Sequence, residues 1–120
     1  MLPDYAPEEI ADLVRGLEAV GKGTIAGTLY DLGSHPGVVL DPASSRRVAG
    51  AVFRLPEDGR LLPALDEYEE YWPDSPDKSQ FIRRLYPVLL NDGRRLGCWV
   101  YEYNRSTERA PVIESGVYLR

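Results

Sequence analysis

The chain has 120 residues, of which 43% are apolar and 28% charged, so one soluble globular domain spanning 1–120 is expected. The net charge is −5 and the 14 basic residues form no cluster, which argues against a nucleic-acid partner. One cysteine and one histidine exclude a disulfide framework and the Cys or His clusters of common metal sites.

Membrane insertion and secretion are not indicated either. No apolar run approaches the roughly 20 residues that a membrane-spanning helix needs. The first ten residues, "MLPDYAPEEI", lack the basic and apolar regions of a secretory signal. We therefore expect a cytoplasmic protein with no membrane partner.

The first half of the chain predicts a helix followed by strands. Pro7 to Val20 has proline and two acids in its first turn and an apolar stripe at helical spacing. Strands are expected at 24–32, 38–41 and 47–55. Gly27 lies inside the first strand, which indicates a bulge or a close backbone approach.

The second half predicts another helix, from Asp58 to about Tyr71, and then a hairpin. The hairpin strands are expected at 81–90 and 95–103, and "NDG" between them tolerates the positive φ of a tight turn. The tail after the hairpin reads as irregular. Several strands with two helices and no strict β-α-β alternation indicate an α+β fold.

The acidic run in "LPALDEYEEY" (62–71) contains one carboxylate on the apolar face of its predicted helix. With Leu65 at 0° on a helical wheel, Glu69 falls at about 40°, inside the apolar stripe. Asp66, Glu67 and Glu70 fall at about 100° or more, toward solvent. Glu69 is therefore the candidate for a chemical role among the four acids.

Two interpretations of Glu69 follow from its place on the wheel. Burial among apolar side chains raises the pKa of a carboxyl group, which would suit Glu69 to carry protons near neutral pH. Alternatively, Glu69 pairs with Arg83 or Arg84 and is purely structural.

Four segments in order resemble the γ-glutamylcyclotransferase-like (AIG2-like) family. They cover about residues 23–105, and their order and spacing carry the resemblance rather than any single motif. The segments are "GTIAGTLYDLGSHPGVVLD", "VAGAVFRL", "LLPALDEYEEYWPD" and "GCWVYEYNR".

The resemblance implies an α+β fold with a mixed, barrel-like sheet and two or three helices. It also implies an enzyme whose substrate is a γ-glutamyl amine or peptide. In this reaction the substrate's own α-amine attacks its γ-carbonyl, giving 5-oxoproline and a free amine, with no cofactor or metal. The family's acid/base is the Glu of Leu-Asp-x-x-Glu, which corresponds to Glu69, and Glu70 replaces the usual glycine that follows.

A departure from the family pattern concerns the first strand. The family begins with a strand carrying Tyr-Gly-Ser/Thr-Leu, whose backbone holds the glutamyl group, and this chain shows no such segment. We expect the chain to be N-terminally truncated relative to the family and to lack that strand. The alternative function is then a non-catalytic module that binds a small ligand or a protein on the same fold.

The resemblance also suggests substrate-binding residues. Tyr30, Tyr101 and Tyr103 lie on predicted strands whose family counterparts border the pocket, although aromatic packing in the core is the simpler explanation for any one of them. Gly33 reads first as a turn residue, with pocket lining as its secondary role. His35 reads as an exposed turn residue, with a general-base role as the other possibility.

Overall fold

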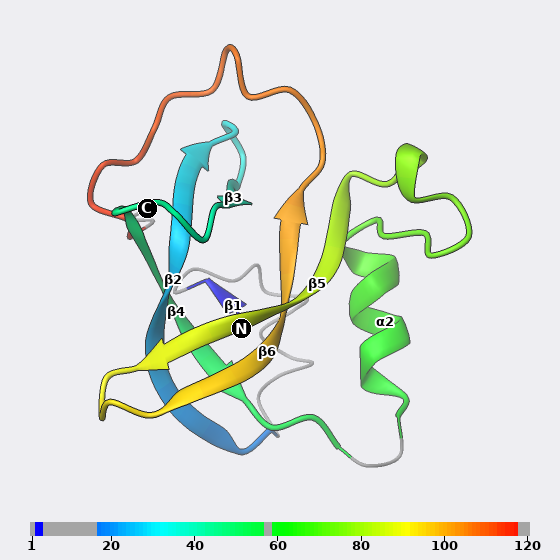
Figure 1. The fold of residues 1–120 in the computed structure, drawn as a ribbon. Helices are drawn as coiled ribbons and strands as arrows, with labels where there is room; N and C mark the ends of the chain where they lie inside the picture. Colours follow the sequence, from blue (N-terminus) through cyan, green and yellow to red (C-terminus); the bar gives the residue numbers. More distant parts are fainter. Residues whose placement is uncertain (1, 4–16, 57–58, 118–120) are drawn as a thin grey trace.

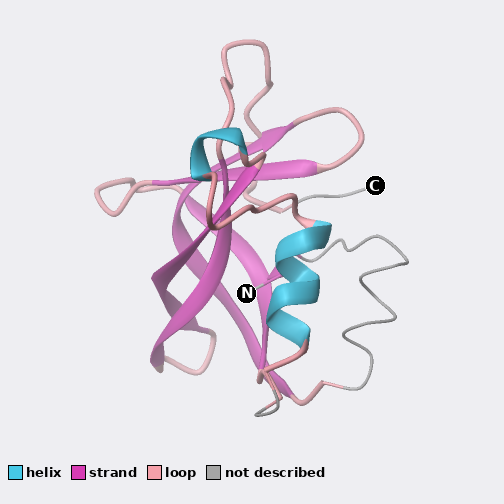
Figure 2. Cartoon of the chain, turned by 90° about the vertical axis from the view of Figure 1, so that its right-hand side faces the viewer, coloured by secondary structure: helices cyan, strands magenta, loops and turns pink. Residues whose placement is uncertain are grey.

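The computed structural model describes residues 2–3, 17–56 and 59–117. Figure 1 shows a twisted sheet with one helix, α2, beside it, and Figure 2 shows the same arrangement from the side. The α+β class is confirmed, with a single α-helix and one short 3₁₀ helix in the part of the chain described. In chain order the elements are β1 (Leu2–Pro3), β2 (Ala19–Asp31), β3 (Pro36–Leu40), β4 (Arg47–Phe53), α2 (Leu61–Tyr68), the 3₁₀ helix η1 (Pro76–Lys78), β5 (Phe81–Leu90) and β6 (Arg95–Tyr103).

Strand β2 lies at the centre of the sheet and pairs with β3, β4 and β5. The strand order is β1-β4-β2-β5-β6, with β3 also paired to β2, and every described pairing is antiparallel. The sheet runs from β1 to β6 and is not closed into a barrel among these strands. Alternate residues of β2, among them Ile25 and Leu29, are buried, as the period of two in a half-buried strand requires.

Glycine in β2 allows close approach of a neighbouring backbone. A Cβ on Gly27 would lie 2.6 Å from the carbonyl oxygen of Val39 in β3. Of the two alternatives predicted for Gly27, close approach is therefore the one observed. The register shift in β2 lies further upstream, between Ala19 and Gly21.

The helix predicted over 7–20 is wrong at its C-terminal end, and residues 7–16 lie outside the described part of the chain. Ala19 and Val20 belong to β2, where Ala19 pairs with Phe53 of β4. The strand pairing with β4 therefore outweighs the local helical spacing of these residues.

The predicted β5–β6 hairpin is confirmed residue for residue. Its register runs from Phe81 opposite Tyr103 to Leu89 opposite Arg95. Gly93 adopts φ +94° in the connecting turn, a conformation that glycine tolerates without strain. Inward-facing residues of the strands form one apolar core, consisting of Ile25, Leu29, Val38, Val48, Val52, Tyr86, Val88, Leu90 and Val100.

The irregular tail returns from β6 to the sheet. It runs over the end of the sheet in Figure 1 and then lies along β2. The backbone N–H of Ile113 donates to the carbonyl of Leu29 (2.8 Å), and Asp31 N–H donates to the carbonyl of Pro111 (2.9 Å). The tail therefore holds the β2 end that leads into the β2–β3 turn.

Candidate active site

Helix α2 is shorter than predicted and ends at the acidic run. It spans Leu61–Tyr68, whereas Asp58, its predicted first residue, lies outside the described residues. The N–H of Tyr71 donates to the carbonyl of Asp66 (2.8 Å) and the N–H of Glu70 to that of Glu67 (3.1 Å). This bond pattern is a Schellman motif, with Glu69 as the C-cap.

Glu70 occupies the position of this motif at which glycine is preferred. Its φ is +54°, and it is the only non-glycine residue with positive φ in the described part of the chain. A side chain costs free energy in the left-handed region, which gives a physical reason for the glycine expected there from the family pattern.

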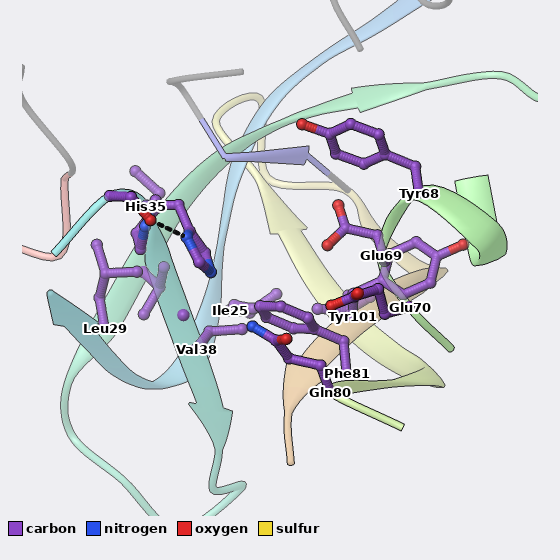
Figure 3. Close-up of a pocket in the computed structure, with 16 residues that line it drawn as sticks. Ile25, Leu29, His35, Val38, Tyr68, Glu69, Glu70, Gln80, Phe81 and Tyr101 are labelled. Atoms are coloured by element: carbon purple, nitrogen blue, oxygen red, sulfur yellow. Dashed lines mark hydrogen bonds between the residues drawn. The ribbon is translucent and has the colours of Figure 1, made fainter. Parts of the chain in front are cut away.

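A cavity of about 400 Å³ opens between the end of α2 and the β2–β3 turn. Figure 3 shows Glu69, Glu70 and Tyr101 on one side of it and His35 and Leu29 on the other. The described lining is mainly apolar and consists of Ile25, Leu29, Ser34, His35, Pro36, Gly37, Val38, Val48, Ala49, Tyr68, Glu69, Glu70, Gln80, Phe81, Val100 and Tyr101.

Glu69 is half-buried at this cavity, and its environment favours the neutral acid. Burial raises the pKa of Glu69 from its ordinary value of 4.5 to about 7. The two arginines that could have neutralised it are engaged elsewhere: Arg83 forms an ion pair with Asp66 and Arg84 with Glu102. The arrangement can therefore take up and release a proton near neutral pH.

Asp66 does not lie on the solvent side as the helical wheel predicted. It is only 7% exposed, and it accepts a hydrogen bond from the Tyr101 hydroxyl (2.5 Å). Arg83 Nε lies 2.9 Å from the same carboxylate oxygen, an ion pair without a well-aligned hydrogen bond. A charged partner from β5 thus allows this carboxylate to be buried.

The Asp66–Arg83–Tyr101 cluster joins α2 to the β5–β6 hairpin. The Arg83 guanidinium stacks on Trp99, with its Cζ 4.5 Å from the ring centroid, and also faces Tyr71 at 5.8 Å. Burial and the hydrogen bond to Asp66 raise the pKa of Tyr101, which keeps its hydroxyl protonated. The cluster holds the end of α2, and with it Glu69, against the cavity.

Of the five residues predicted for the site, Glu69 and Tyr101 line the cavity together. Tyr30, Gly33 and Tyr103 are not among its lining residues. Gly33 has φ +98° and its N–H donates to Asp31 Oδ1 (2.8 Å), which is a turn role. The substrate-binding roles of all four, Tyr101 and Gly33 included, stay predictions. Tyr103 packs on the lining residue Phe81, with ring centroids 5.4 Å apart.

Ser34 and His35 also line the cavity, although the sequence reads His35 chiefly as an exposed turn residue and gives no role to Ser34. His35 is half-buried rather than exposed, and its Nδ1 lies 2.8 Å from the Ser34 hydroxyl oxygen. Both belong to the β2–β3 turn, and turn residues are solvent-exposed by default. The only available signal was their place directly after the strand of Tyr30, whose family counterpart borders the pocket.

The described residues contain neither a metal-binding cluster nor a membrane-spanning helix. No group of three or more His, Cys, Asp or Glu side chains there could hold a metal ion. No helix among them is long and apolar enough to span a membrane.

Three solved structures share the fold. The crystal structure of YkqA from Bacillus subtilis gives a TM-score of 0.67 at 16% identity, over 97% of this chain but 36% of YkqA. The solution structure of ytfP from Escherichia coli gives 0.60 at 27% identity, over 86% and 78%. The uncharacterized protein PH0828 from Pyrococcus horikoshii gives 0.58 at 16% identity, over 95% and 80%.

The structural matches show the fold, and the sequence match identifies the family. The chain spans little more than a third of the length of YkqA. No curated protein matches it. The sequence model of the gamma-glutamyl cyclotransferase, AIG2-like family matches residues 7–120. The chain therefore belongs to the gamma-glutamyl cyclotransferase, AIG2-like family.

Proposed function

We propose that this protein cyclises a γ-glutamyl amine to 5-oxoproline and releases the free amine, with Glu69 as the acid/base. The observation that carries the proposal is a half-buried carboxyl at a cavity of about 400 Å³, whose pKa is raised to about 7. Membership of the gamma-glutamyl cyclotransferase family supports the reaction type.

The chemistry requires only one protein group that moves protons. The Glu69 carboxylate takes a proton from the substrate's α-ammonium, and the freed amine attacks the γ-carbonyl carbon to close a five-membered ring. The carbon–nitrogen bond to the leaving amine then breaks as Glu69 returns the proton to that nitrogen. The ring nitrogen releases its remaining extra proton to the solvent, giving the lactam N–H, and the released amine takes up one proton from the solvent, so the protons balance.

Proximity comes from the substrate itself. Nucleophile and electrophile belong to one molecule, so the reaction needs no Ser or Cys nucleophile from the protein. The protein's task is to hold the folded substrate, exclude water and present one carboxyl group. The apolar lining around Ile25, Val48 and Val100 suits this task, because it also keeps the Glu69 pKa high.

The test is a 5-oxoproline release assay over a panel of γ-glutamyl amines, including γ-glutamyl dipeptides and γ-glutamyl-ε-lysine. Glu69→Gln should lower turnover by at least about 100-fold, the usual scale for a lost acid/base. Glu67→Gln is the matched control, because Glu67 is exposed on the same helix and does not line the cavity.

Two results would contradict the proposal. Equal turnover by wild type and Glu69→Gln would remove Glu69 from the mechanism. Binding of 5-oxoproline without turnover of any γ-glutamyl amine would instead support the non-catalytic binding module.

A further inference from the structure

The cavity described above has walls of opposite chemical character. One wall is the C-terminal end of α2, which presents Glu69 and Glu70. Carbonyl groups at a helix C-terminus carry partial negative charge, so this wall attracts cations and repels anions. An ammonium group of a ligand belongs here and a carboxylate does not.

The opposite wall is the β2–β3 turn, which presents Ser34 and His35. Figure 3 shows the His35 ring across the cavity from Glu69. The Ser34 hydroxyl lies 2.8 Å from His35 Nδ1. If that hydroxyl donates to Nδ1, the other ring nitrogen, Nε2, carries the hydrogen and is a donor.

The turn holds His35 in place through several contacts. The carbonyl of His35 accepts the N–H of Leu32 (3.0 Å), and its ring tilts against Phe81 with centroids 6.1 Å apart. Gly37, two residues on, is packed so closely that a Cβ there would lie 2.7 Å from the Leu32 side chain. The imidazole is therefore a positioned group rather than a freely moving one.

The cavity offers a ligand carboxylate no stronger side-chain partner. Neither Lys nor Arg occurs among the described residues that line it. The Tyr101 hydroxyl, a second possible donor, already donates its hydrogen bond to Asp66. A bound anion would thus depend on neutral donors, which include Ser34 and His35 on the turn and the side-chain amide of Gln80.

We propose that Ser34 and His35 bind the α-carboxylate of the ligand, with His35 as the direct donor and Ser34 as the residue that fixes its tautomer. This deepens the proposed function and rests on it for the identity of the ligand. An α-amino acid fragment would then lie across the cavity with its amine toward Glu69 and its carboxylate toward the turn. The pair would thereby determine which face of the glutamyl group reaches the base.

The test compares two ligands that differ only in the carboxylate. 5-Oxoproline carries it, and 2-pyrrolidinone is the same lactam ring without it. Titrations followed by NMR would give both dissociation constants for wild type, for His35→Phe, which keeps the ring contact with Phe81 but no donor, and for His35→Gln, which restores a donor. Ser34→Ala and Ser45→Ala complete the set, because Ser45 is exposed and outside the cavity.

We expect wild type to bind 5-oxoproline more tightly than 2-pyrrolidinone by about tenfold or more, the scale of a hydrogen bond to a charged group. His35→Phe should abolish this preference, His35→Gln should restore part of it, and Ser34→Ala should reduce it. Ser45→Ala should leave it unchanged. In turnover, His35→Phe should raise KM more than it lowers kcat.

Three outcomes would overturn the proposal. The first is equal affinity of wild type for both lactams, including no measurable affinity for either. The second is an unchanged preference in His35→Phe whose thermal melting shows an intact fold. The third is a fall in kcat alone, which would make His35 a proton carrier. Failure of the proposed function is separate, because it would appear as full activity of Glu69→Gln or as no turnover of any γ-glutamyl amine by wild type.

Discussion

Replacing Glu69 by glutamine should stabilise the folded protein, and the gain should depend on pH. The pKa of Glu69 rises from 4.5 to about 7 on folding, so the folded state holds a proton that the unfolded chain releases. Stability from this group is complete below about pH 4.5 and is lost as pH rises through 7. The difference of roughly 2.5 pKa units corresponds to about 3 kcal/mol at most.

Glutamine is neutral at every pH and has nearly the same shape. The difference in unfolding free energy between Glu69→Gln and wild type should thus be near zero at about pH 4.5 and grow to about 1–3 kcal/mol at pH 8. Urea denaturation of both proteins at several pH values measures it, and all other titrating groups cancel in the comparison. Glu67→Gln, at an exposed position of the same helix, is the matched control variant.

A difference that stays constant with pH would refute this reasoning, because it would mean that Glu69 titrates alike in the folded and unfolded chains. A difference of the opposite sign at pH 8 would mean that the folded state stabilises the charged carboxylate. Either result would also remove the main support for Glu69 as a proton carrier.

Four further predictions follow from the same structure. In a pH profile, kcat/KM should rise as a group with a pKa near 7 loses its proton, and Glu69→Gln should abolish this rise. Asp66→Asn should lower the unfolding free energy by about 3 kcal/mol, since it leaves the Arg83 charge buried without its partner, and urea denaturation measures this. Glu70→Gly should raise the melting temperature, corresponding to about 1 kcal/mol, by relieving positive φ. Gly27→Ala should cost more than about 2 kcal/mol in the same urea assay, whereas Gly97→Ala, with no contact under 3.7 Å, should be nearly neutral.

The parts of the fold that sequence predicts well are those fixed by local chemistry. The β5–β6 hairpin was predicted to the residue, because the sequence between its strands carries its own turn chemistry in Asn91, Asp92 and Gly93. Ala19 and Val20 were assigned to a helix because their spacing suits one, but their place in β2 is set by β4, some thirty residues away. A local pattern does not contain that pairing.

The same limit explains which site residues sequence could find. Glu69 was identifiable because its position on the helix and its neighbours are all local. Asp66 was placed toward solvent at about 100° on the wheel, and only Arg83 on β5 and Tyr101 on β6 make its burial possible. His35 was read as exposed because nothing in its own segment reveals that the turn faces the end of α2.

The position of Glu69 at the C-cap has a chemical consequence beyond placing it at the cavity. A carboxylate at a helix C-terminus faces the negative end of the macrodipole, and here Glu70 follows it directly. The dipole opposes the charged form, and burial, which raises the pKa of Glu69 to about 7, acts in the same direction. A helix N-terminus would have lowered the pKa of the same residue and made it a weak base. Ending α2 at Glu69 rather than starting a helix there thus suits one carboxyl group to accept a proton from an ammonium and return it to a leaving amine.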